Sequence, residues 1–274
     1  MKKRVLSALL AASMMLTMAP IPSLAAGPEA KEITLGTAGV LGYANGYDYV
    51  YYGDYEGDPV KWRVLDTTSN DGTTPALFLW SDAILGNYTW GEEPDDVMNP
   101  PQGWNIWADS EFKTYLQGEF FQSIFSDAEQ NAVLATTKTE SQLTVGNSRV
   151  HGCNLNGETL FPISVLEATN TKYGFSSSTD PDPSRTPIEG DDQSYWLRSP
   201  FTFGSVMQMN GVASVHGKGI TPEGGMIDVT TYVTPGLSAG VRPAFNLKAG
   251  DVLFTSPAQG GKTADGLTAV DDTA

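Results

Sequence analysis

The chain contains a single cysteine, Cys153, among its 274 residues. One cysteine cannot form a disulfide within the chain, so the folded state has to be stabilised by its core. Histidine is almost as rare, with only His151 and His216 present. A zinc site built from several histidines is therefore excluded, and zinc would need Cys153 or carboxylates as ligands.

Basic residues are also scarce: 16 Lys and Arg stand against 32 Asp and Glu, a formal net charge of −16. Nucleic-acid binding depends on basic side chains that neutralise phosphates, so this balance argues against a nucleic-acid partner. Binding to anionic membranes is disfavoured for the same reason. A strongly acidic surface is instead typical of a soluble protein whose copies repel one another.

Long apolar runs are missing except at the N-terminus. Three basic residues at positions 2–4 precede an apolar stretch over residues 5–18, and small residues follow up to Ala25. This order is typical of a secretory signal peptide, and the stretch is too short for a membrane span. We expect residues 1–25 to be removed and the exported chain to insert in no membrane.

The remaining chain predicts one domain over residues 26–250, which is long enough to bury a core without covalent cross-links. Residues 251–274 are mostly Gly, Thr, Asp and Ala, with little to bury. We expect them to form a flexible tail or a linker.

Strand patterns and helix signals are both present along the domain. Residues 49–52 and 62–65 predict paired strands, and the apolar run 76–80 predicts a strand buried on both faces. After these strands, Ser110 is expected to cap a helix whose buried face carries Phe112, Leu116 and Phe120. Two capping boxes, Ser126 with Glu129 and Ser164 with Glu167, predict further helix starts.

Two segments further along the chain predict irregular structure. Residues 176–193 are polar and rich in proline, so we expect a long surface loop there. Asn210 and Gly211 separate two short apolar runs at residues 206–209 and 212–215, which predicts a two-residue hairpin turn.

Two sequence phrases stand out, Tyr195-Trp196-Leu197-Arg198-Ser199-Pro200 and Gly240-Val241-Arg242-Pro243-Ala244-Phe245-Asn246-Leu247. Together with Tyr51-Tyr52-Gly53, Lys61-Trp62-Arg63-Val64-Leu65, Trp107-Ala108-Asp109-Ser110 and Phe125-Ser126-Asp127-Ala128-Glu129-Gln130, they resemble a family of secreted bacterial domains of unknown function (DUF6273). The resemblance covers residues 45–250. It implies a C-type-lectin-like fold, similar to that of formylglycine-generating enzymes, whereas periodicity alone gives only α+β.

The implied architecture is an α+β domain, a mixed sheet with flanking helices and long loops. Six residues of these motifs are expected to have structural roles: Trp62, Trp107, Tyr195, Trp196, Arg198 and Arg242. The two arginines are flanked by apolar residues, where their donors can tie strand and loop carbonyls together. Binding of a carboxylate ligand is the alternative.

Candidate ligand-binding residues lie in the loops. Trp90 and Trp104 border a proline-rich segment, where an exposed indole stacks on sugars or anchors a protein partner; core packing is the alternative. Asp191 and Asp192, with Asp180 and Asp182 nearby in sequence, carry oxygen ligands of the kind that calcium prefers. Their spacing does not fit the EF-hand pattern, so we favour solvated loop acids and assign no metal site. No cofactor is assigned, and calcium stays open.

No catalytic constellation emerges from the sequence. Formylglycine-generating relatives hold copper with a pair of cysteines, and this chain has one. Cys153 lies near His151, but without a known signature an incidental cysteine is favoured over a nucleophile. The leading hypothesis is therefore a non-catalytic binding or adhesion module, secreted or at the cell surface, for an extracellular protein or glycan. The alternatives are a carboxylate-based glycoside hydrolase and a structural domain of a larger surface protein.

Overall fold

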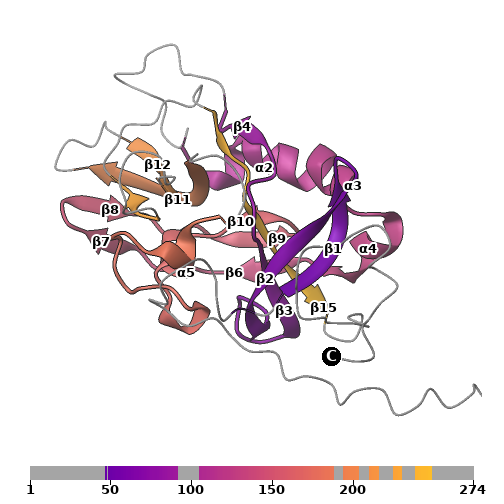
Figure 1. The fold of residues 1–274 in the computed structure, drawn as a ribbon. Coiled ribbons are helices and arrows are strands. Elements are labelled where there is room, and N and C mark those ends of the chain that lie inside the picture. Colours follow the sequence, from indigo (N-terminus) through magenta and orange to yellow (C-terminus); the bar gives the residue numbers. More distant parts are fainter. Residues whose placement is uncertain are drawn as a thin grey trace, which may run out of the picture.

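The computed structural model describes residue 47 and residues 49–91, 105–187, 194–203, 210–215, 225–229 and 238–248. The predicted signal segment and the predicted tail lie outside these ranges. The described residues form an α+β fold in which antiparallel strands predominate and short helices pack beside them (Figure 1). None of the helices among these residues has the length and apolar character required to cross a membrane.

The first sheet contains the strands predicted from the N-terminal part of the chain. Its order is β1 (Tyr49–Tyr55), β2 (Asp58–Thr68), β3 (Pro75–Ser81), β15 (Pro243–Lys248) and β10 (Phe161–Pro162), with β5 (Val133–Leu134) also paired to β15. All of these pairings are antiparallel. In β3 every residue after Pro75 is buried, which confirms the expectation of a strand covered on both faces. The C-terminal strand β15 therefore lies in the middle of a sheet that the N-terminal strands begin.

The second sheet is organised around β11. Its order is β13 (Ile227–Asp228), β12 (Asn210–Val215), β11 (Tyr195–Phe203), β14 (Ser238–Gly240) and β4 (Asn87–Thr89), with β8 (Ser148–Val150) and β7 (Leu143–Val145) branching from β11. A separate two-stranded sheet pairs β6 (Thr136–Lys138) with β9 (Leu155–Glu158). The sequence phrase at residues 195–200 thus lies in β11, and the phrase at residues 240–247 runs from the end of β14 in the second sheet into β15 in the first.

The predicted helices begin at the predicted caps. Ser110 accepts a hydrogen bond from the Lys113 amide, and α2 (Glu111–Tyr115), the π-helical turn η2 (Leu116–Phe120) and α3 (Phe121–Ile124) follow without a break. Both capping boxes are present, at the starts of α4 (Asp127–Ala132) and α5 (Val165–Ala168). The described residues also form three short 3-10 helices: η1 (Trp107–Asp109), η3 (Thr171–Tyr173) and η4 (Pro183–Arg185).

An aromatic core joins the first sheet to these helices. The rings of Trp62 and Phe245 meet edge to face with centroids 4.7 Å apart, and Phe125 from the end of α3 lies 5.2 Å from Phe245. Such tilted contacts are the favoured geometry for aromatic pairs. The helix face predicted from Phe112, Leu116 and Phe120 is buried as well.

The predicted hairpin turn at Asn210-Gly211 is wrong. Asn210 pairs with Thr202 and Gly211 with Phe201, so both residues belong to strand β12. Hydrogen bonding to β11 outweighs the local turn preference of this dipeptide. Residues 206–209, the other half of the predicted hairpin, lie outside the described residues.

The predicted surface loop at residues 176–193 is wrong for Asp182 and residues 184–187, which are buried, whereas residues 176–181 are partly or fully exposed. Asp182, Ser184, Arg185 and Thr186 are each 5% exposed or less, and residues 183–185 form η4. Proline content and polarity predict exposure only if the polar groups find no partners inside the protein. In this segment the carbonyls of residues 184–186 accept hydrogen bonds from buried arginines. Residues 188–193 lie outside the described part of the chain.

Two glycines provide a test of the packing between β1 and α3. Gly53 and Gly57 both have positive φ, at 72° and 92°, so alanine is strained at either site. A Cβ on Gly53 would collide with the Ile124 carbonyl and the Phe125 ring, whereas nothing lies within 4 Å of one on Gly57. We expect Gly57→Ala to cost about 1 kcal/mol and Gly53→Ala about 2 kcal/mol more, measured by urea unfolding. Equal losses would show that α3 does not hold β1 this closely.

Candidate functional site

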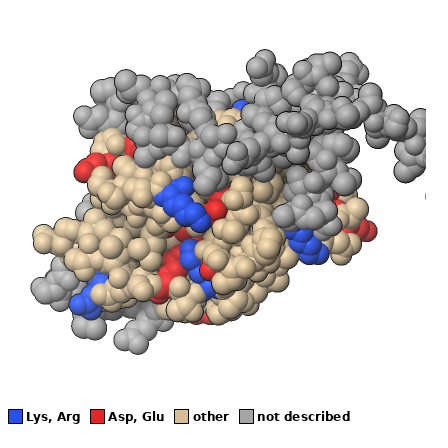
Figure 2. Space-filling model, turned by 90° about the horizontal axis from the view of Figure 1, so that it is seen from below, with Lys and Arg blue, Asp and Glu red and all other residues tan. Residues whose placement is uncertain are grey.

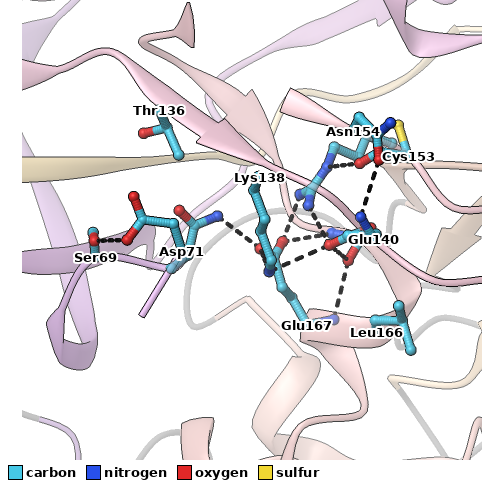
Figure 3. A network of polar contacts seen from close by, with 12 residues as sticks. Ser69, Asp71, Thr136, Lys138, Glu140, Cys153, Asn154, Leu166 and Glu167 are labelled. Carbon is cyan, nitrogen blue, oxygen red and sulfur yellow. Dashed lines mark hydrogen bonds and ion pairs between the residues drawn. The ribbon is translucent and has the colours of Figure 1, made fainter. Parts of the chain in front are cut away.

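One prominent polar feature of the interior is a network of four charged side chains. Arg198 donates to Glu167 Oε2 at 2.5 Å and to Glu140 Oε1 at 2.6 Å. Lys138 Nζ lies 2.6 Å from Glu167 Oε1 and 3.3 Å from Glu140 Oε1. Figure 3 shows the side chains of Lys138, Glu140 and Glu167 pointing toward one another. We call these four residues the charge network; two cations balance two carboxylates in it.

The charge network is almost completely shielded from water. The side chains of Arg198, Glu167 and Glu140 are 0%, 1% and 2% exposed, and that of Lys138 is 18% exposed. Each residue comes from a different segment: β11, α5, the residues after β6, and the end of β6. Figure 2 shows basic and acidic side chains next to one another across the middle of the face seen from below, without a patch of one sign.

Glu167 both caps helix α5 and forms buried ion pairs, and only the capping role can be predicted from the local sequence. Its Oε2 accepts from the Ser164 amide at 2.9 Å, which is the capping-box contact. The same carboxylate binds Arg198 and Lys138, and Oε1 accepts from Asn70 Nδ2 at 2.7 Å. Burial alone would raise the pKa of Glu167, but Arg198 and Lys138 outweigh burial and hold that pKa below its ordinary value.

Neutral side chains extend the network to the first sheet. Asn70, in the turn after β2, forms two hydrogen bonds with Asn246 of β15. Asn246 Nδ2 donates to Asn70 Oδ1 at 2.8 Å, and the backbone N–H of Asn70 donates to Asn246 Oδ1 at 3.1 Å. Asn246 Nδ2 also donates to Thr136 Oγ1 of β6 at 2.7 Å. Polar contacts therefore connect the first sheet, the β6–β9 pair and β11.

A second group of buried arginines binds backbone carbonyls. Arg63 donates to the carbonyls of Ser184 and Thr186, at 2.6 and 2.8 Å, and to Asp82 Oδ1 at 2.5 Å. Arg242 donates to the carbonyls of Ser81, Asp82 and Arg185, and its guanidinium lies 3.4 Å from the centre of the Trp80 ring. These contacts explain why residues 184–186 lie inside the protein.

Arg185 itself is surrounded by carbonyl oxygens. Its guanidinium donates to the main-chain oxygens of Ala168, Asp180, Gly225, Ser176 and Ser178. An arginine offers five N–H donors in a fixed plane, so one side chain can satisfy several irregular backbone groups at once. Sequence reasoning missed this residue because its partners are main-chain atoms, which leave no pattern of residue types.

The structure places the predicted structural residues in the interior. Trp62, Trp107, Tyr195, Trp196, Arg198 and Arg242 are all 1% exposed or less. Arg242 contacts carbonyls, as its structural interpretation expects. Arg198 also binds carbonyls, those of Cys153 and Pro162, but its shortest contacts are to the carboxylates of this chain.

The predicted ligand-binding residues have different outcomes. Trp90 is only 1% exposed and packs against Trp107, Phe112 and Trp196, which corrects the expectation of an exposed indole. Its ring is large and apolar, and the neighbouring aromatic rings bury it. Trp104, Asp191 and Asp192 lie outside the described residues.

The other loop acids are not grouped around a common point. Asp180 is exposed, whereas Asp182 is buried and accepts from the amides of Ser176 and Ser184. Across the part of the chain that the structure describes, no three His, Cys, Asp or Glu residues are placed to hold a metal ion. The interpretation of Asp182 as a solvated acid is therefore wrong, because backbone donors draw it inside.

Cys153 does not have the surroundings of a nucleophile. It is buried, and burial raises the pKa of its thiol to about 12. A cysteine needs a lowered pKa to be reactive near neutral pH. The ring of His151 contacts Thr202 Oγ1 at 3.2 Å, and burial lowers the pKa of that imidazole.

Partly exposed tyrosines form the second candidate feature. Tyr88 of β4 and Tyr115 of α2 stack with ring centroids 3.9 Å apart and planes 5° apart. Phe112 backs Tyr88 at 6.0 Å, and Phe120 lies between Tyr115 and Tyr55 at 5.3 and 5.9 Å. All three tyrosines are partly exposed. We call Tyr55, Tyr88 and Tyr115 the tyrosine cluster; its rings pack against the core and remain partly exposed.

The low pKa of Glu167 gives a pH-dependent stability. A carboxylate whose pKa is lower in the folded than in the unfolded chain stabilises the fold above its unfolded pKa of about 4.3, and this contribution is lost as the pH falls. We expect Glu167→Gln to be less stable than wild type at pH 7 and the difference to shrink toward about pH 3. Urea unfolding across this range measures it. A difference that stays constant with pH would contradict the ionised state of Glu167.

Comparison with known proteins adds a family. Neither the curated proteins nor the solved structures contain a match to this chain. The model of one family, the domain of unknown function DUF6273, matches residues 76–249. The match begins in β3 and takes in the whole charge network, but it leaves out β1 and β2, which the resemblance from sequence included. Because it covers more than half of the chain, the chain belongs to the DUF6273 family.

Proposed function

We propose that this domain is a non-catalytic binding module, secreted or at the cell surface, that recognises an extracellular glycan or protein through the tyrosine cluster. The stacked pair Tyr88 and Tyr115 carries the proposal. Tyrosines offer a large amphipathic contact area at low cost in side-chain entropy, and rings held by their neighbours lose little freedom on binding.

The charged groups of the interior do not fit a hydrolytic active site. Arg198 and Lys138 hold the carboxylates of Glu140 and Glu167 by direct contacts. A general acid for glycoside hydrolysis needs a carboxyl group with a raised pKa, and the pKa of Glu167 is shifted the other way. The buried thiol of Cys153 is likewise protonated at neutral pH. The hydrolase alternative thus gains no support from these groups.

Export and the lectin-like architecture belong to the same proposal. The N-terminal pattern of basic, apolar and small residues motivates secretion. The resemblance to C-type-lectin-like domains motivates a surface-binding role by analogy of fold. The proposed partners are extracellular proteins or glycans, with neither nucleic acid nor inserted membrane among them, and calcium is the one cofactor worth testing.

Binding of residues 26–274 to a glycan array and to extracellular protein extracts, with calcium and with a chelator, tests the proposal. We expect saturable binding that Tyr115→Ala weakens about tenfold or more, because an aromatic anchor at a binding surface contributes at least about 1.4 kcal/mol. Tyr49→Ala is the matched control, since Tyr49 is also partly exposed but lies at the opposite end of β1 from Tyr55.

Either of two results would count against this proposal. Binding that Tyr115→Ala leaves unchanged would remove the tyrosine cluster as the site, and the absence of binding to glycan and protein alike would favour the structural-domain alternative. Loss of binding with the chelator would instead assign calcium to the site.

A further inference from the structure

Lys138 and Asn70 meet at one carboxylate oxygen. Lys138 Nζ donates to Glu167 Oε1 at 2.6 Å, and Asn70 Nδ2 donates to the same oxygen at 2.7 Å. The distance between Lys138 Nζ and Asn70 Nδ2 therefore cannot exceed the sum of these two hydrogen-bond lengths. A nucleophile and an acyl group that contact the same proton carrier are the components of an amide-exchange reaction.

The carbonyl of Asn70 is also polarised. Its Oδ1 accepts a hydrogen bond from Asn246 Nδ2 at 2.8 Å. The Asn246 side chain is positioned by two further hydrogen bonds, one to Thr136 Oγ1 and one from the backbone N–H of Asn70. Attack on Cγ would place negative charge on Oδ1, where this donor is already aimed. The nitrogen that would leave, Nδ2, is the atom bound to Glu167.

Water has little access to the acyl group. Asn246, Glu167 and Asn70 are 0%, 1% and 5% exposed, and the side chain of Lys138 is 18% exposed. Exclusion of water protects a newly formed amide from hydrolysis and favours amine attack over water attack. An isopeptide bond would also cross-link the fold covalently, which a disulfide within this chain cannot do because Cys153 is its only cysteine.

We propose that Lys138 and Asn70 become joined by an intramolecular isopeptide bond, with Glu167 carrying the protons. The Lys138 ammonium loses a proton to Glu167, and Nζ attacks Cγ of Asn70. The Nζ–Cγ bond forms and the Cγ–Nδ2 bond breaks. The two protons lost by Nζ end on the leaving nitrogen, which departs as an ammonium ion. Glu167 returns to its ionised state, and no oxidant or reductant is consumed.

The surrounding charges set the pace of this reaction. Arg198 bonds to Glu167 Oε2 at 2.5 Å and, with Lys138, keeps the pKa of that carboxyl below its ordinary value despite burial. Such a carboxylate is a weak base, so the first proton transfer is slow. Residues 70 and 138 meet only in the folded chain, and we therefore expect the bond to form after folding. The inference does not depend on what the domain binds.

Mass spectrometry of the intact folded protein, residues 26–274, tests the proposal. Samples are taken directly after purification and over several days at mildly alkaline pH. We expect the mass to become lower than the sequence mass by one ammonia, and proteolysis to yield a branched peptide that joins Asn70 to Lys138. A folded protein that keeps the full sequence mass throughout would overturn the proposal.

Two variants separate this reaction from another source of the same mass change. Succinimide formation at an Asn-Gly pair such as Asn156-Gly157 also releases ammonia. Lys138→Arg keeps a cation beside Glu167 but has no amine nucleophile, and Asn70→Ala removes the acyl group. Both variants, checked for folding by circular dichroism, should lack the branched peptide and lose less ammonia than wild type, and any loss that remains in them is assigned to a succinimide. Ammonia loss in folded Lys138→Arg to the same extent as in wild type would refute the proposed bond.

Discussion

The guanidinium of Arg198 is the point at which separate parts of the fold are joined. It binds Glu167 of α5, Glu140 beyond β6, and the main-chain oxygens of Cys153 and Pro162, while its own backbone belongs to β11. A charge removed from water to this extent costs several kcal/mol unless its partners are all in place. Correct placement of Arg198 therefore requires that β11, α5 and the segments around β6 and β10 assemble together. The tryptophan and phenylalanine core supplies the bulk of the burial, and Arg198 restricts how its parts are arranged.

Hydrogen bonds from other buried arginines stabilise the irregular segments around residues 168–186. Arg63 and Arg242 donate to carbonyls in residues 184–186, and Arg185 donates back to carbonyls in residues 168–180. Buried main-chain oxygens need donors, and strands or helices supply none to a proline-rich segment. Guanidinium groups take that role here. We propose the tyrosine cluster, and not these buried cations, as the surface for a partner.

The sequence was informative where structure is decided locally. Alternation and apolar runs predicted β1, β2 and β3, and the serine–glutamate pairs predicted the starts of α4 and α5, because caps depend on residues three apart. It failed where distant partners decide. Asn210-Gly211 is drawn into β12 by β11. The carbonyls of Ser184 and Arg185 are bound by Arg63 and Arg242, which lie 121 and 57 residues away. The contacts of Glu167 with Asn70 and Lys138, which are 97 and 29 residues away, have no periodic signal. The family motifs marked Arg198 but not its partners.

A double-mutant cycle between Arg198 and Glu167 tests most directly whether their ion pair organises the fold. Arg198→Met and Glu167→Gln, alone and together, are compared with wild type by urea unfolding at pH 7. Each single substitution should cost about 3–5 kcal/mol, since it breaks a buried ion pair and leaves the charge network with unequal numbers of positive and negative groups. The double variant should be more stable than the sum of the two losses predicts, by at least about 1 kcal/mol. Losses that add to within about 0.5 kcal/mol would show that the two charges act independently and would contradict the account.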